Sequence, residues 1–132
     1  MTVLKARVSD RRGLAEALQR LFHGGPISGL VVAGFDQDGR LCGVAANPRH
    51  RALSWVKVWE LAALANELEA HSLRVLVFPS GSAPTPSAHE LAVFRDLAAR
   101  AKRAGFLLID CAVFRGDRMW SLREMQEEQI GA

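Results

Sequence analysis

The stretch LRVLVFPSGSAPTPSAHELAVFRDLAARAKRAGFLLIDCAVF, residues 73–114, decides the fold. Its apolar start, Leu73–Phe78, predicts a buried strand. Pro79–Pro86 contains three prolines, one glycine and three small polar residues, which predicts an ordered loop. Apolar residues then recur at helical spacing as far as Ala104, and Phe106–Phe114 predicts a second strand. The stretch therefore predicts a strand, a loop, a helix and a strand.

Both ends of the predicted helix carry boundary signals. Ser87 stands three residues before Glu90, which is the spacing of a capping box. Gly105 follows the last apolar position and favours a helix stop, because glycine adopts the left-handed conformation without strain. The helix is therefore predicted to begin after Ser87 and to end before Gly105.

The pattern continues upstream of this stretch. Apolar spacing after Ser9-Asp10 predicts an N-terminal helix within residues 1–26. Ile27–Phe35 and Arg40–Ala46 predict two strands, and Asp36–Gly39 between them predicts a hairpin turn. Ser54–Ala70 predicts a helix that is apolar over more than half of its circumference, and such a helix is packed on more than one side.

Downstream, Arg115–Arg118 predicts a turn and Met119–Leu122 a last strand. The charged tail, residues 123–132, is predicted to fray. The predicted order is α-β-β-α-β-α-β-β. This order indicates an α/β (α+β) protein with a mixed sheet flanked by helices, in a single domain over residues 1–132.

Composition is that of an ordinary globular protein. Of the 132 residues, 49% are apolar and 23% are charged, which argues against disorder, and the net charge is +3. No apolar run approaches the ~20 residues that span a bilayer. Met1–Arg12 is not followed by the apolar region of a signal peptide. Two cysteines, Cys42 and Cys111, make no disulfide framework, so we expect reduced thiols and a cytoplasmic location.

The segment LVFPSGSAPTPSAHE, Leu76–Glu90, resembles the metal-site segment of the RadC-like branch of the JAB/MPN (JAMM) family. That family's segment reads HNHPSGDPTPS, followed by two residues and an aspartate. Ala104–Cys111 resembles the family's Gly-Ile-x-Leu-x-Asp-His strand, and Gly34–Leu41 and Gly116–Glu124 resemble its hairpins. The resemblance covers residues 27–125 approximately, and it implies a three-layer, cytidine-deaminase-like fold.

The resemblance implies a zinc site at positions that are Leu76, Phe78 and Glu90 in this sequence. In the family, two histidines, an aspartate and a water bind zinc, and a glutamate acts as general base. Leucine and phenylalanine offer a metal no lone pair, and no acidic residue occurs between Gly39 and Trp59. We therefore expect no metal or other cofactor and no enzyme activity. Leu76 and Phe78 are expected to fill the former site as core residues.

Polar residues elsewhere in the segments that carry the resemblance leave a second interpretation open. A remnant pocket would consist of Ser80, Ser87, Asp110 and Cys111. Ser87 and Cys111, together with His89 and Glu90, would then form the non-standard active site of a hydrolase. In that site Cys111 needs a general base within reach. The simpler interpretation makes Ser87 a helix cap, His89 a solvated residue and both cysteines buried structural residues.

Two further surfaces are candidates for binding. Trp55 and Trp59 stand four residues apart in one predicted helix, where they are either core residues or an interface, for example of a homodimer. Arginines at four positions suggest a nucleic-acid-binding face: Arg49, Arg51, Arg95 and Arg103. Interspersed acids favour a solvated charged surface instead.

These observations predict a catalytically inactive RadC-like domain that acts as a protein-interaction or scaffolding module. Its expected partner is a second copy of the chain or another protein, with no membrane involved. The resemblance implies an association with DNA repair in bacteria. Two alternatives remain: nucleic-acid binding through the arginines, and a hydrolase with a non-standard site.

Overall fold

The computed structural model describes residues 2–8, 16, 19–20, 29–50, 52–78, 85–115 and 118–131. One six-stranded sheet has the order β1-β3-β2-β4-β5-β6. Only β4 and β5 pair in parallel, and the other neighbouring strands are antiparallel. The mixed α+β class predicted from the sequence is therefore confirmed. The strands, from β1 to β6, are Thr2–Val8, Gly29–Phe35, Leu41–Asn47, Ser72–Phe78, Leu107–Arg115 and Arg118–Ser121.

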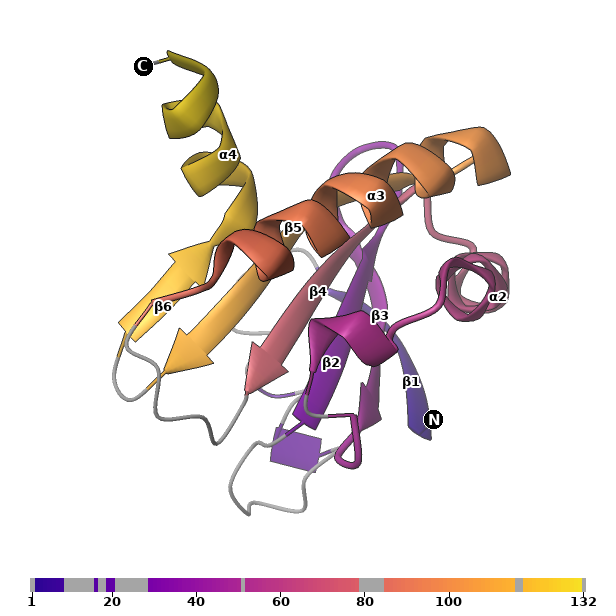
Figure 1. Cartoon of the computed structure of the whole chain (residues 1–132). Helices are drawn as coiled ribbons and strands as arrows, with labels where there is room; N and C mark the ends of the chain where they lie inside the picture. Colours follow the sequence, from indigo (N-terminus) through magenta and orange to yellow (C-terminus); the bar gives the residue numbers. More distant parts are fainter. Residues whose placement is uncertain are drawn as a thin grey trace.

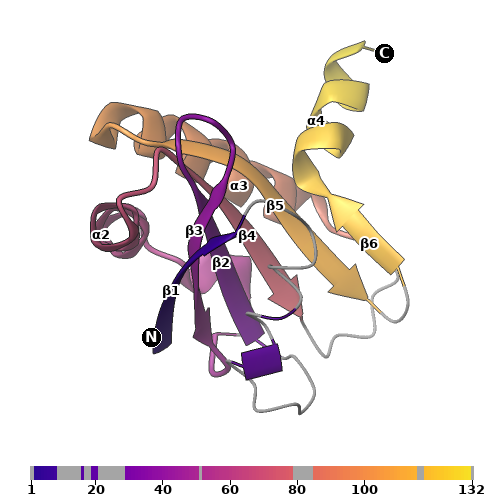
Figure 2. The same cartoon turned by 180° about the vertical axis from the view of Figure 1, so that it is seen from behind.

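Helices cover one face of the sheet. The short 3₁₀ helix η1 (Leu53–Trp55) and α3 (Ala88–Ala104) lie in front of the strands in Figure 1, with α2 (Val58–Leu68) seen end-on beside them. The view from behind in Figure 2 has the strands in front. The last helix, α4 (Leu122–Gly131), continues from β6 at the edge of the sheet and extends away from it (Figure 2). The long crossover through α3 allows β4 and β5 to be parallel neighbours.

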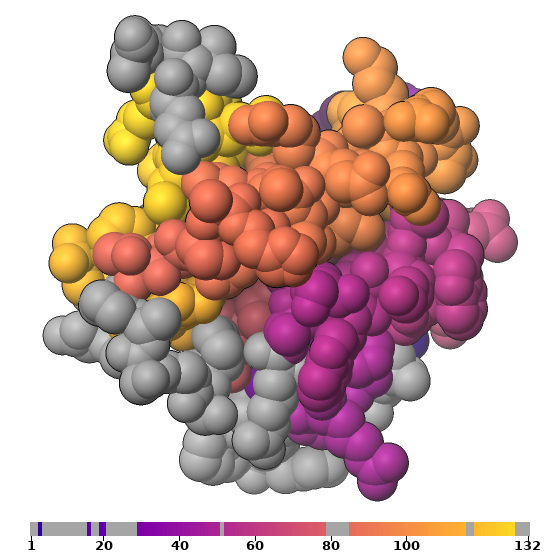
Figure 3. Space-filling view, viewed as in Figure 1, coloured from indigo at the N-terminus to yellow at the C-terminus, as the bar shows by residue number. Residues whose placement is uncertain are grey.

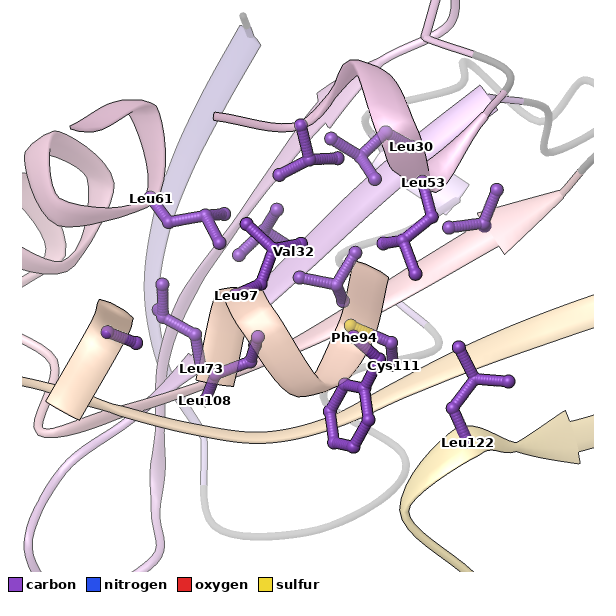
Figure 4. Close-up of a cluster of buried hydrophobic side chains, with 14 of the residues drawn as sticks. Leu30, Val32, Leu53, Leu61, Leu73, Phe94, Leu97, Leu108, Cys111 and Leu122 are labelled. Atoms are coloured by element: carbon purple, nitrogen blue, oxygen red, sulfur yellow. The ribbon is translucent and has the colours of Figure 1, made fainter. Parts of the chain in front are cut away.

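The main core lies between the sheet and these helices (Figure 4). β4 contributes Val75 and Val77, while α2 contributes Leu61 and α3 contributes Phe94. Residues alternate between the two faces of a strand, so Val75 and Val77 share the face that the helices cover. A smaller cluster of Ala33, Leu41 and Val44 lies outside this core.

Three predicted boundaries are confirmed. Ser87 caps α3: its Oγ accepts from the Glu90 backbone N at 3.2 Å, and the Glu90 carboxylate accepts from the Ser87 backbone N at 3.1 Å. Gly105 ends α3 with a φ of 96°. In the hairpin turn, the Asp36 carboxylate accepts from the backbone N of Asp38 and of Arg40, both at 2.9 Å. Each boundary uses local hydrogen bonds, which a short sequence pattern specifies.

The prediction of one helix over Ser54–Ala70 is wrong in its first four residues. The chain forms η1, becomes extended at Val56 and Lys57, and only then begins α2. Val56 is buried against the core in this extended conformation, which a β-branched residue adopts readily. Burial of that side chain therefore interrupts a pattern that has helical periodicity throughout.

Two terminal predictions also need correction. The sequence pattern predicts no strand at Thr2–Val8, yet β1 pairs with β3 at the edge of the sheet. The tail forms α4 where fraying was expected. Ser121 caps this helix by accepting from the Glu124 backbone N at 3.2 Å, and the Asp110 carboxylate accepts from the Arg123 backbone N at 3.0 Å. Tertiary anchoring of the first turn thus overrides the polar composition of the tail.

Some predicted features fall outside the described residues. Of the predicted N-terminal helix, only residues 16, 19 and 20 are described, and they are helical. Residues 79–84, which include Ser80, are not described, and neither are Arg51 or the centre of the last turn. Among the described helices, none has the length and apolar character required to cross a membrane.

Candidate functional site

A groove of about 440 Å³ runs between the start of α2 and the adjacent side of α3. Figure 3 views this side of the molecule, with α3 lying above η1 and the first residues of α2. Val56 and Val93 give the groove an apolar floor, while Lys57, His89 and Asp96 add polar groups. An apolar groove with a few polar groups is the usual character of a binding site.

A second chamber, of about 270 Å³, lies at the N-terminus of α3. Ser54, His89 and Val93 line both the groove and the chamber, so the two spaces are adjacent. Ser87 and Arg115 line the chamber but not the groove. The capped end of α3 therefore forms the inner wall of the candidate site.

An ion pair holds the inner end of the chamber. Nη2 of Arg115 lies 2.6 Å from Oε1 of Glu90, and their side chains are 11% and 21% exposed. Nη1 of the same arginine donates to the Thr85 carbonyl at 2.7 Å. The guanidinium thus connects the end of β5 to the loop and cap before α3. The sequence pattern places Arg115 only in a turn, because nothing in that local pattern identifies a partner 25 residues away.

The structure does not bring Leu76 and Phe78 to Glu90. Val77 faces the chamber with Glu90, so the two neighbours of Val77 on β4 face the other side of the sheet. Both are partly buried there, and Phe78 stacks on Phe114 with ring centroids 4.4 Å apart. The expectation that they fill a former site beside Glu90 therefore fails on geometry.

The residues at the family's ligand positions do not fit zinc. Two are hydrocarbon side chains on the far face of the sheet, and the third, Glu90, is already paired with Arg115. Within the described part of the chain, no group of three or more histidine, cysteine, aspartate or glutamate side chains is arranged to hold a metal ion.

The predicted remnant pocket is not assembled. Ser87 caps α3, whereas the Asp110 carboxylate accepts from Ser121 Oγ at 2.6 Å and supports the start of α4. Cys111 lies in the main core and is fully buried, near Phe94 in Figure 4. Neither Asp110 nor Cys111 lines the groove or the chamber.

Burial raises the pKa of the Cys111 thiol well above its usual range, and the negative charge of Asp110 adds to the rise. A nucleophilic cysteine needs a lowered pKa and access to solvent, and Cys111 has neither. His89, by contrast, is exposed on the first turn of α3. The separation removes the thiol from any site built around Ser87, His89 and Glu90.

We expect Cys111 in the native protein to react with iodoacetamide at least about a hundredfold more slowly than in urea, because opening a core position costs several kcal/mol.

The raised pKa of Cys111 also predicts a pH dependence of stability. The unfolded thiol ionises above about pH 8.5, while the folded thiol stays neutral. Stability from this group is therefore present below that pH and lost as the pH rises further. Peptide mass mapping and urea unfolding at pH 7.5 and 9.5, compared with Cys111→Ala, test both statements. Rapid native alkylation would contradict them.

Trp55 and Trp59 are both on the surface, 54% and 70% exposed, so their interpretation as core residues is wrong. They do not share one helix, because Trp55 ends η1 and Trp59 lies in the first turn of α2. The Trp55 ring meets His50 edge-on at 6.4 Å between centroids. The structure therefore leaves two large apolar side chains exposed within five residues of sequence.

The candidate nucleic-acid residues are dispersed. Arg49 follows the end of β3, where Asn47 pairs with Leu30 at the start of β2. The neighbouring residue Gly29 pairs with Phe78, so Arg49 lies at the end of the sheet where β4 also ends. Arg103 lies at the opposite end, close to the start of β5. Arg95 and Arg103 are exposed on α3, and Asp96 between them pairs with Arg100 at 3.0 Å. Arg49 and Arg103 therefore do not belong to one patch.

No family model matches this chain, and no curated protein matches it.

Proposed function

We propose that this chain is a catalytically inactive RadC-like JAB/MPN domain, associated with DNA repair in bacteria, that works as a protein-interaction or scaffolding module. The observation that carries the proposal is the exposure of Trp55 and Trp59 at 54% and 70%. Tryptophan is enriched among the residues that contribute most to protein interfaces. Exposed side chains of this size are costly to leave in water unless a partner covers them.

The chemistry of the site supports an interaction role over hydrolysis. The motif around Leu76–Glu90 carries the family resemblance, but hydrocarbon side chains stand where the family has its histidines. Glu90, the one remaining carboxylate of that set, neutralises Arg115. Because function depends on the site more than on the fold, loss of the site favours a non-catalytic role.

The first experiment measures metal content per chain in untagged protein that was purified without chelator. We expect a molar ratio of zinc, iron or manganese to chain below about 0.1, because no described site offers three ligands. We also expect no cleavage of peptide or isopeptide substrates after zinc is added. One metal per chain together with hydrolysis would overturn the proposal and favour a non-standard site at His89 and Glu90.

A second experiment tests the interaction surface. A Trp55→Ser/Trp59→Ser variant is compared with Met119→Ser, which changes a 59% exposed side chain on β6. We expect only the double variant to lose association, whether with a second copy or with another protein, while both keep the wild-type circular dichroism spectrum. Equal behaviour of the two variants would contradict the proposal. DNA binding that weakens steeply with salt would favour the nucleic-acid alternative.

A further inference from the structure

We propose that the groove between α2 and α3 binds a small amphipathic carboxylate, a molecule with one anionic group and an apolar body. The inference goes beyond the proposed function, because Trp55 and Trp59 do not line this groove. Three properties of the groove carry it: an aliphatic floor, acidic side chains that are already neutralised, and two hydrogen-bond donors on opposite walls.

The floor of the groove is aliphatic. Val56 and Leu97 are buried there, and Val58 and Val93 are partly buried against the main core. The volume of about 440 Å³ lies within the range of roughly 300–1,000 Å³ that is usual for sites that enclose a small molecule. A hydrocarbon body that covers these four side chains leaves water together with them, which favours a ligand with an apolar part.

The acidic side chains of the groove and of the adjacent chamber are neutralised. In the groove, Asp96 pairs with Arg100, with 3.0 Å between Oδ2 and Nε. In the chamber, Glu90 pairs with Arg115, with 2.6 Å between Oε1 and Nη2. Because each acid of the described lining has an arginine, Lys57 remains as the excess positive charge of these two spaces.

Lys57 and His89 stand on opposite walls of the groove. Lys57 lies in the extended segment before α2, and His89 lies in the first turn of α3. Neither side chain has a hydrogen bond or an ion pair with another described residue. An ammonium group donates up to three hydrogen bonds, and a neutral imidazole donates one. A carboxylate in the groove therefore has donors available on both walls.

The same lining favours a carboxylate over a phosphate. Phosphate is typically held by the rigid fork of an arginine, whereas lysine is a compact point charge. Both arginines of the described lining already bind a carboxylate of the protein, Asp96 in the groove and Glu90 in the chamber. One excess positive charge matches a ligand with one negative charge, so that little charge is left unbalanced on binding.

Three probes test the ligand class. Sodium octanoate has the chain and the charge, 1-octanol has the chain alone and sodium acetate has the charge alone. We expect octanoate to bind with a Kd below about 1 mM, and at least about tenfold more tightly than the other two, because only octanoate contacts both the floor and the donors. Amide NMR spectra should show the largest shifts at Val56, His89 and Val93. Equal binding of octanol and octanoate, or no octanoate binding, would overturn the inference.

Matched lysine substitutions test the charge. Lys57→Met keeps the aliphatic stem and removes the ammonium group, and Lys102→Met does the same at an exposed lysine of α3 outside the groove. We expect Lys57→Met to weaken octanoate binding about tenfold, the loss of one charge-assisted hydrogen bond, and Lys102→Met to leave it unchanged. Equal affinities of the two variants would contradict the assignment of Lys57.

Matched alanine substitutions test the location. Ala92 is exposed and lines the groove, whereas Ala99 is an exposed alanine of the same helix outside it. We expect Ala92→Phe to fill the groove and abolish octanoate binding, and Ala99→Phe to bind like the wild type, with circular dichroism spectra to check that both variants fold. Full binding by Ala92→Phe would place the ligand elsewhere. If an acidic peptide binds the groove and octanoate does not, the inference fails, and the proposed function stands or falls separately with the tryptophan variant.

Discussion

Replacing Phe94 by alanine is expected to lower the free energy of unfolding by about 3–5 kcal/mol. Phe94 is 3% exposed and lies in the main core with residues from every layer of the described fold (Figure 4). The substitution removes buried aromatic area and leaves a cavity between α3 and the sheet, which the rigid strands cannot close. Urea unfolding measures the loss, and an unchanged m value would show that the denatured state is not the cause.

Phe78→Ala is the matched control for this prediction. The sequence favoured Phe78 as a core residue, but the structure places it partly buried on the other side of the sheet, stacked on Phe114. We expect a loss of about 2 kcal/mol, from partial burial and the ring pair. A loss at position 78 equal to that at position 94 would contradict this ranking and return Phe78 to the core.

The parts of the fold that the sequence predicted are those with local signals. The capping box of Ser87 and Glu90, the stop at Gly105 and the Asp36 turn each depend on residues within four positions of one another. Helical periodicity located α3, because its buried apolar residues face a single layer, and short apolar runs located β4 and β5. The parts that failed depend on contacts distant in sequence. β1 exists because β3 offers it an edge, and α4 because Asp110 holds its first turn.

The candidate site was less accessible to sequence reasoning for the same reason. Ser87 and Glu90 could be placed at the start of a helix, but the orientation of β4 depended on a single polar residue, Arg74, within the run Leu73–Phe78. Arg74 is exposed and shares its face of the strand with Leu76 and Phe78, so it marks that face as the outer one, but the two large apolar side chains were assigned to the core. A split of α2 from η1 at Val56 likewise separated Trp55 from Trp59.

Arg115 and Glu90 give the second large effect, which we expect to appear in a double-mutant cycle. Glu90→Gln keeps a capping side chain at α3, since glutamine also serves the capping box, but leaves the guanidinium of Arg115 without its carboxylate partner at 2.6 Å. Because Arg115 is only 11% exposed, this loss should be about 3 kcal/mol. Arg115→Met should cost about 2 kcal/mol, because the Glu90 carboxylate it leaves behind is more exposed and keeps its bonds to Ser87.

The double variant, Glu90→Gln/Arg115→Met, removes both charges and should lose less than the sum of the single variants. The expected coupling is about 1.5–3 kcal/mol, as for residues that share one hydrogen-bonded pair. The pair is mostly buried, so this coupling should change little between low and high salt. Additive losses would show that the two side chains do not interact in solution. The chamber at the start of α3 would then lack the connection between β5 and the helix cap that shapes it.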